Sequence, residues 1–289
     1  MSLIKNLMNF FSEQGDTKKI NRIAKTFTAL KKQNRKALIP FITAGDPNPG
    51  ITVQLMHQLV QSGADIIELG VPFSDPMADG PTIQRSSERA LKHHVSLNDV
   101  LNMVAEFRKT DADTPVVLMG YANPVEALGY AAFAAKAKDC GVDGILIVDY
   151  PPEESGEWVQ CLQQQEIDAI FLLSPTTPQK RIEQVAKMAQ GYIYYVSLKG
   201  VTGASHLDLQ EVSAMLKQLR QYISLPIGVG FGIRDGATAK AVADLADAVV
   251  VGSRIIEEIE KSSDAELLDN VGKVLSILRK AIDEHSGNV

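Results

Sequence analysis

A regular alternation of two kinds of segment constrains this chain more than any other feature. From residue 37 onward, short aliphatic runs alternate with longer amphipathic stretches, and the alternation occurs eight times. The runs predict strands at 37–43, 65–71, 116–121, 144–149, 168–174, 192–198, 226–232 and 248–253, and the stretches between them, such as 53–62, 125–140 and 178–190, predict helices.

Strands that alternate with helices pair in parallel, because each right-handed crossover passes over one face of the sheet. Eight such units over about 250 residues match the size of a closed barrel. An open doubly wound sheet is the alternative, but the first strand lacks the G-x-G-x-x-G turn typical of nucleotide-binding versions. We therefore expect an α/β fold, a (β/α)8 TIM barrel formed by residues 37–289 as one catalytic domain.

Composition excludes several classes of protein. The chain has 289 residues, of which 45% are hydrophobic and 22% charged, values typical of a soluble globular protein. No apolar run approaches the roughly 20 residues that span a bilayer. The net charge of −6 disfavours a nucleic-acid binder with a broad basic face. Two cysteines are too few for a disulfide scaffold, which favours a cytoplasmic location.

Residues 1–36 differ in charge from the rest. They carry nine Lys or Arg against Glu13 and Asp16, about +7, which leaves about −13 for the remainder. A targeting peptide is one interpretation, but polar residues interrupt the apolar pattern and the two acids are atypical of a transit peptide. We expect a short extension followed by a helix that covers the bottom of the barrel.

The active site of such a barrel lies at the carboxyl ends of its strands. Polar residues are frequent at these ends, whereas lysines are few. Lys199 follows the sixth strand, so an aldolase that forms a Schiff base is possible but not favoured. None of the five histidines shares a strand end with the acids, so we expect no metal site.

Glycines gather near the end of the chain, after strand six, in strand seven and after strand eight. Barrels often bind phosphate with the loops after strands seven and eight and the start of a short helix. Glycine lets backbone N–H groups approach an anion closely. The alternative is that these glycines only permit tight turns and close packing. We expect a phosphate site that includes Gly232, Gly252 and Ser253.

Two acids stand out in and after the second strand. If Ile67 and Leu69 face the helices, Glu68 points into the barrel, where lost hydration raises its pKa toward the range useful for proton transfer. A structural ion pair is the alternative. Asp79 lies in a proline-rich loop and could accept a hydrogen bond from substrate, or could only cap a turn.

These residues also resemble a known family. The stretch 68–81, ELGVPFSDPMADGP, is similar to the signature of tryptophan synthase alpha subunits. Agreement continues at 40–47 (PFITAGDP), 118–124 (LMGYANP), 201–203 (VTG) and 229–233 (VGFGI), and covers the chain from about residue 20 to its end. Two features depart from the pattern: the extension of about 20 residues, and Leu198-Lys199, where short enteric forms have an arginine-containing pair.

The resemblance implies a retro-aldol cleavage of indole-3-glycerol phosphate into indole and glyceraldehyde 3-phosphate. It implies that Glu68 is the catalytic acid–base, that Asp79 is the second catalytic carboxylate and that Tyr194 is an active-site tyrosine. The substrate-binding positions that it implies are Phe41, Tyr121 and Phe231 at the indole, Gly203, Gly232, Gly252 and Ser253 at the phosphate, and Thr202 in a closing loop.

The resemblance further implies a partner, a beta subunit, in an α2β2 heterotetramer through which indole passes. Pyridoxal phosphate would belong to that partner, and this chain would need no cofactor. The apolar and proline-rich segments 72–81 and 121–130, taken here as loops at the rim of the site, are compatible with such a partner.

Two other functions compete with this one. The first is another enzyme on the same scaffold, such as a phosphosugar isomerase or a free-standing indole-glycerol-phosphate lyase. The second is a binding module that has lost catalysis and only activates its partner. The presence of both Glu68 and Asp79 argues against the second.

Overall fold

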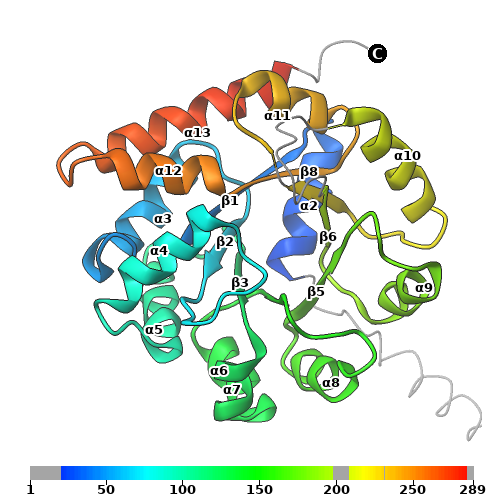
Figure 1. Ribbon diagram of the computed structural model, residues 1–289, viewed down its shortest axis with the longest axis horizontal. Coiled ribbons are helices and arrows are strands. Elements are labelled where there is room, and N and C mark those ends of the chain that lie inside the picture. Colours follow the sequence, from blue (N-terminus) through cyan, green and yellow to red (C-terminus); the bar gives the residue numbers. More distant parts are fainter. Residues whose placement is uncertain (1–20, 198–207, 231, 285–289) are drawn as a thin grey trace, which may run out of the picture.

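The computed structural model describes residues 21–197, 208–230 and 232–284. Within them, eight parallel strands form a closed barrel in sequence order, with neighbouring strands paired and β8 paired to β1. Helices surround the barrel as a ring (Figure 1). The strands are β1 (Ala37–Thr43), β2 (Ile67–Gly70), β3 (Val116–Gly120), β4 (Gly144–Ile147), β5 (Asp168–Leu173), β6 (Ile193–Val196), β7 (Ile227–Gly230) and β8 (Ala248–Val251).

The (β/α)8 prediction is confirmed, and all eight strands lie where they are expected. Most are one to three residues shorter at one or both ends. The helices on the outside are α3 (Thr52–Gln61), α4 (Pro81–Leu91), α5 (Leu97–Phe107), α6 (Ala122–Leu128), α7 (Tyr130–Asp139), α8 (Gly156–Gln164), α9 (Gln179–Met188), α10 (Leu209–Leu219), α11 (Gly236–Ala243), α12 (Ser253–Lys261) and α13 (Leu267–Asp283), with a short 3-10 turn, η1 (Pro49–Ile51), before α3.

The prediction of a single helix at 125–140 is wrong. The chain forms α6 and α7 instead, separated by Gly129, whose φ of +85° and ψ of 137° end the first helix. Glycine occupies such a backbone conformation without the steric cost of a Cβ. The prediction of a loop at 121–130 is also wrong, because most of this segment forms α6.

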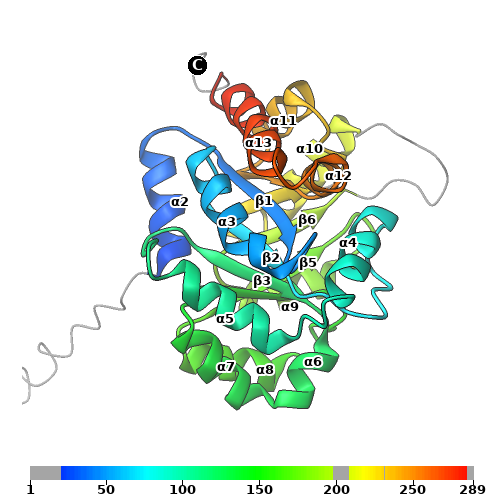
Figure 2. The same cartoon turned by 90° about the vertical axis from the view of Figure 1, so that its left-hand side faces the viewer.

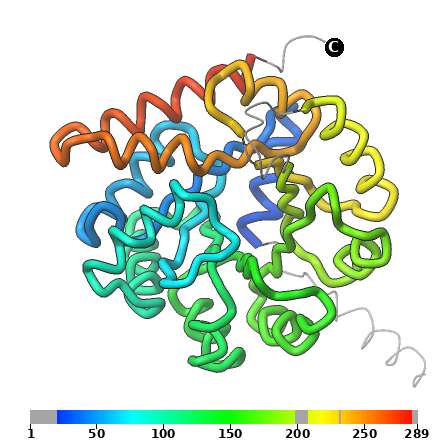
Figure 3. Tube along the Cα trace, in the orientation of Figure 1, coloured from blue at the N-terminus to red at the C-terminus, as the bar shows by residue number. Residues whose placement is uncertain are grey.

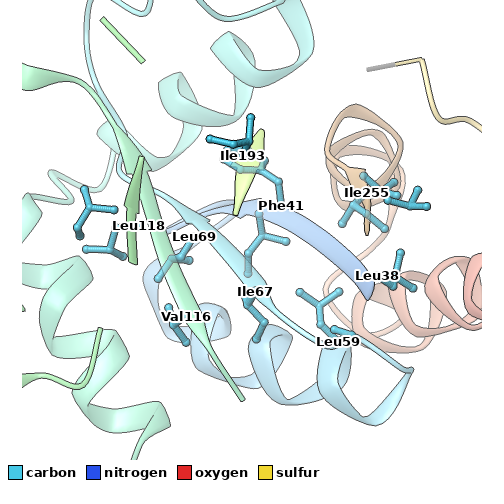
Figure 4. Packing of buried hydrophobic residues seen from close by; sticks show 14 of the residues in the cluster. Leu38, Phe41, Leu59, Ile67, Leu69, Val116, Leu118, Ile193 and Ile255 are labelled. Atoms are coloured by element: carbon cyan, nitrogen blue, oxygen red, sulfur yellow. The ribbon is translucent and has the colours of Figure 1, made fainter. Parts of the chain in front are cut away.

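Alternating side chains divide the apolar residues into two layers. Side chains that point outward pack against the ring of helices, as Ile67 of β2 does beside Leu59 of α3 (Figure 4). Side chains that point inward form a second cluster, which includes Ile39, Val117 and Tyr192. The inner cluster fills the lower part of the barrel, so polar side chains are confined to its upper end.

Helix α2 (Arg22–Lys32) covers the amino-terminal end of the barrel, at the opposite end from α4 and α6 (Figure 2). Its Ile23 and Leu30 belong to the inner cluster, and the ring of Phe27 lies 6.0 Å from the ring of Tyr192. Arg22 pairs with the buried carboxylate of Asp143 at 2.9 Å. The helix therefore forms an apolar floor beneath the inner cluster.

Three buried or half-buried aspartates at this end share one arrangement, and we refer to Asp65, Asp143 and Asp247 as the floor aspartates. Each precedes an even-numbered strand and accepts a hydrogen bond from a backbone N–H at the start of the preceding odd-numbered strand, at 2.8–2.9 Å. Each also pairs with an arginine. The pairs are Asp65 with Arg279, Asp143 with Arg108, and Asp247 with Arg220.

Candidate active site

Glu68 is buried in the interior of the barrel, with 1% of its surface exposed. It lies on β2 between Ile67 and Leu69, which pack outward, so the alternation of the strand directs it inward. The hydroxyl of Tyr192, the residue just before β6, donates a hydrogen bond to its Oε1 at 2.5 Å. Burial raises the pKa of Glu68 to about 7, and the Tyr192 hydrogen bond opposes the rise. Near neutral pH this carboxyl can both give and take a proton.

Asp79 lies in the loop between β2 and α4, where Tyr121 determines its position. The Tyr121 hydroxyl donates to Oδ2 of Asp79 at 3.0 Å and accepts a hydrogen bond from the N–H of Ala78 at 3.0 Å. The Phe73 ring stacks on the Tyr121 ring with centroids 5.0 Å apart. Burial raises the pKa of Asp79, and the Tyr121 hydrogen bond opposes that rise.

A small cleft lies between these elements at the carboxyl ends of β1, β2 and β3. Phe41, Tyr121 and Asp79 line it, together with Val71 and Ile83. Flat aromatic walls with one carboxylate suit a flat aromatic ligand that carries a polar N–H. Phe41 is also the strand neighbour of Glu68 in the pairing of β1 with β2, so the two carboxyl groups approach one region of the barrel.

Tyr194 lies on β6 two residues above Tyr192 and points to the same side. Burial, and then the charges of Glu68 and Asp79, raise its pKa, so its hydroxyl stays protonated and can donate a hydrogen bond. A Cβ at Gly230 on β7 would lie 2.3 Å from the Tyr194 hydroxyl oxygen. Gly230 therefore makes room for this ring, a packing role like the alternative considered for the glycines.

The three described residues expected at the phosphate lie at the same end of the barrel. Gly232 follows β7 with a φ of +76°, Gly252 follows β8, and Ser253 begins α12. Among the described residues, no side chain caps the first turn of α12, whereas Asp208 and Asp235 cap α10 and α11. Backbone N–H groups of an uncapped first turn are available to an anion. Thr202, Gly203 and Phe231 lie outside the described residues, as do Leu198 and Lys199.

Two site residues were missed in the sequence. Tyr192 was missed because its contact with Glu68 joins residues 124 positions apart; the only signal was its two-residue spacing from Tyr194. Gln84 was missed because nothing distinguishes it from other polar residues of a helix. Its side-chain amide donates to the backbone carbonyl of Asp79 at 2.8 Å.

In the described ranges, no group of three or more His, Cys, Asp or Glu side chains could hold a metal ion. The same ranges contain no helix with the length and hydropathy to cross a bilayer. The described site thus consists of two carboxyl groups with raised pKa values, a tyrosine hydroxyl, aromatic walls and an uncapped helix terminus. Such a set supports general acid–base chemistry on an aromatic phosphate ester.

Comparison with known proteins agrees with this geometry. The family model described as tryptophan synthase alpha chain matches residues 27–282. The chain is 71% identical over 267 residues to a tryptophan synthase alpha chain of Nitrosospira multiformis and 69% identical to that of Nitrosomonas europaea, with 92% of this chain and 96% and 97% of those proteins covered. The crystal structure of tryptophan synthase subunit alpha from Legionella pneumophila superposes with a TM-score of 0.86 at 49% identity, covering 91% of this chain and 99% of that one.

Proposed function

This chain belongs to the family of tryptophan synthase alpha chains, and on that premise we propose that it is a lyase that cleaves indole-3-glycerol phosphate into indole and glyceraldehyde 3-phosphate. The observation that carries the proposal is Glu68, a carboxyl group buried inside the barrel with a pKa of about 7 and no cationic partner among the described residues. An acid that must first donate and then accept a proton needs a pKa near the working pH.

The reaction must break the bond between indole C3 and the glycerol chain, and neutral indole is a poor leaving group. We assign the first step to protonated Glu68, which donates its proton to C3 and generates an indolenine with a cationic nitrogen. Ionised Asp79 accepts a hydrogen bond from the indole N–H and stabilises the developing positive charge.

The second step uses the same carboxyl group as a base. Glu68, now a carboxylate, removes the proton of the hydroxyl on the carbon bonded to C3. The O–H electrons form the aldehyde carbonyl, and the electrons of the broken carbon–carbon bond restore the indole ring and neutralise its nitrogen. Tyr194 supplies a hydroxyl donor beside both carboxyl groups. The family carries no cofactor of its own, and none is needed for these steps.

We assign the two ends of the substrate to different parts of the site. Phe41, Tyr121 and Phe231 would hold the indole ring, and Gly203, Gly232, Gly252 and Ser253 would hold the phosphate. Thr202 would lie in a loop that closes over the site. Residues 37–289 would be the catalytic barrel, and residues 1–36 an extension with a capping helix.

We further propose a beta subunit as partner, in an α2β2 assembly of the cytoplasm with pyridoxal phosphate bound only by the beta chains. One solved structure that resembles this chain, at 32% identity, is described as tryptophan synthase from M. tuberculosis. In support, Met77 beside the catalytic loop is 82% exposed and Leu128 of α6 is 37% exposed. Met77 lies in the loop that carries Asp79, and Leu128 lies on the helix that follows Tyr121, where a partner could receive indole.

The test is a steady-state assay of indole release from indole-3-glycerol phosphate, with the full chain alone and with a tryptophan synthase beta chain added. We expect turnover in both cases, and faster turnover with the partner. A chain that releases no indole under either condition contradicts the assignment. Fast indole release that a beta chain leaves unchanged would favour a free-standing lyase.

A further inference from the structure

Arg89, on the last turn of α4, joins three segments that are far apart in the sequence. Its Nε and Nη2 donate to the two carboxylate oxygens of Asp46 at 2.6 and 2.9 Å, and its Nη1 donates to Glu260 at 2.9 Å. Asp46 is fully buried in the loop after β1, and Glu260 lies near the end of α12. Arg85, one turn earlier on α4, also forms two hydrogen bonds to Glu260, each at 2.8 Å.

These contacts fix two helices relative to each other. Helices α4 and α12 lie side by side in both views, and both pack against β1 (Figures 1 and 2). A bidentate arginine–carboxylate pair holds its two partners in one geometry, unlike a single flexible ion pair. Arg89 forms this pair with buried Asp46 in the loop after β1 and donates one further hydrogen bond to Glu260. Arg85 forms a bidentate pair with the same Glu260, so the two arginines together hold α4 against this loop and against α12.

The starts of the same two helices bear the two ends of the site. Helix α4 begins two residues after Asp79, and its Gln84 holds the Asp79 carbonyl at 2.8 Å. Helix α12 begins at Ser253, directly after Gly252. A substrate that spans both ends needs a fixed spacing between them, because misplacement of about 1 Å can cost on the order of 100-fold in rate.

We propose that Arg89, acting through Asp46 and Glu260, is a positioning residue that sets the separation between Asp79 and the phosphate-binding start of α12. This inference rests on the proposed function, since it presupposes a substrate bound at both places. Arg89 itself touches neither end of the substrate. Its role is to keep the two helix starts at the spacing that the transition state requires.

A purely structural role is the competing explanation, and Arg108 provides the matched control. Arg108 is more deeply buried than Arg89, with 10% against 21% of its side chain exposed, and it also joins several segments. Its partners include Asp143 and the carbonyls of Gly141 and Thr114, but it lies at the floor of the barrel. Loss of the guanidinium hydrogen bonds of either Arg89 or Arg108 should lower the melting temperature of the protein. Only the loss at Arg89 should change the geometry of the active site.

The experiment compares Arg89→Lys with Arg108→Lys in the full chain, assayed with and without a beta chain, at a temperature where both variants are folded. We expect Arg89→Lys to lower kcat for indole-3-glycerol phosphate about tenfold, because lysine keeps the charge but cannot form the bidentate pair. The inhibition constant of inorganic phosphate, which occupies only one end, should change less than twofold. Arg108→Lys should leave kcat unchanged.

A kcat of Arg89→Lys equal to that of the wild type overturns the proposal, and so does a phosphate inhibition constant that rises as much as kcat falls. If Arg89→Lys does not fold, the variant Glu260→Gln replaces it in the experiment, because Glu260 is partly exposed. We expect Glu260→Gln to lower kcat about threefold and to leave the inhibition constant of phosphate unchanged. An unaltered kcat in that variant also overturns the proposal. If the wild-type chain itself shows no turnover, the proposed function is rejected. The wild-type assay therefore separates failure of the proposed function from failure of the positioning role of Arg89.

Discussion

The floor aspartates and the two carboxyl groups assigned to catalysis lie at opposite ends of the barrel and receive different kinds of partner. At the amino-terminal end, each floor aspartate meets a backbone N–H and an arginine. At the carboxyl-terminal end, the described residues give Glu68 only the hydroxyl of Tyr192 and Asp79 only that of Tyr121. The same eight strands form both ends, so the difference lies in the partners that each carboxyl group receives.

The pKa values of Asp65 and Glu68, which lie three residues apart in the sequence, show the consequence of these different partners. Burial raises the pKa of both groups. At Asp65 the N–H of Leu38 and the charge of Arg279 oppose that rise, whereas at Glu68 one hydroxyl opposes it and the pKa reaches about 7. At Asp65 the N–H and the cation offset part of the cost of burying a carboxylate. One without a cation remains available for proton transfer.

The strongest test of this contrast is Glu68→Gln. The amide has the shape of the acid but cannot exchange a proton with substrate, so we expect indole formation to fall by about 1,000-fold. Phosphate inhibition should be retained, because the α12 terminus is untouched. Measured kcat/KM within tenfold of the wild type would contradict the acid–base role.

The corresponding change at the floor is Asp143→Asn, which removes a buried charge, leaves Arg22 without its carboxylate partner and leaves Arg108 with only the more distant Asp111, 3.9 Å away. We expect a loss of about 4 kcal/mol in the free energy of unfolding, from urea titration, because breaking a buried ion pair strands its partner. The kcat of the folded variant should match that of the wild type. A fall in kcat without a loss of stability would show that the two ends are not independent.

A third prediction links Glu68 to stability. Its folded pKa of about 7 lies above the ordinary value of 4.5, so the folded state holds this proton more tightly than the unfolded state. The stabilisation is present below pH 4.5 and is lost as pH rises through about 7, at a cost of roughly 3 kcal/mol. Glu68→Gln should therefore unfold at a higher urea concentration than the wild type at pH 8, and the difference should shrink at pH 4.5. An equal difference at both pH values would show that Glu68 does not titrate in this range.

The smallest expected effect is that of Tyr192→Phe. Loss of the hydroxyl removes the hydrogen bond that lowers the pKa of Glu68, so the pH dependence of kcat should move upward by about 0.5 to 1 pH unit. Tyr195→Phe is the matched control: Tyr195 lies three residues later, on β6, and packs in the outer layer. Its hydroxyl has no hydrogen-bond partner among the described residues. A shift of the same size in both variants would exclude a specific role for Tyr192.

Much of this contrast was visible in the sequence, because strand alternation is a local property. The aliphatic run around Glu68 predicts both the strand and the inward direction of the carboxyl group, and both agree with the structure. The break at Gly129 was missed because an amphipathic pattern that continues on both sides conceals one residue with a positive φ.

Contacts between distant residues could not be predicted in this way. Tyr192 meets Glu68 across the barrel, and Arg89 meets Asp46 and Glu260 from 43 and 171 positions away. No local pattern records which side chains closure of the barrel will bring together. The family signature identifies Glu68 and Asp79 as candidates, but the groups that set their proton affinity and position emerge only from the folded chain.

Because Phe27 packs against Tyr192, helix α2 influences the proton transfer at Glu68. Tyr192 is at once the neighbour of α2 and the hydrogen-bond donor to Glu68, so the protonation state of the catalytic group depends on a segment that contributes nothing to the cleft. Recombinant versions shortened past Phe27 would replace an apolar ring with water beneath Tyr192. Conversely, protein engineers who want to shift the pH optimum could vary Phe27 and leave every substrate contact intact.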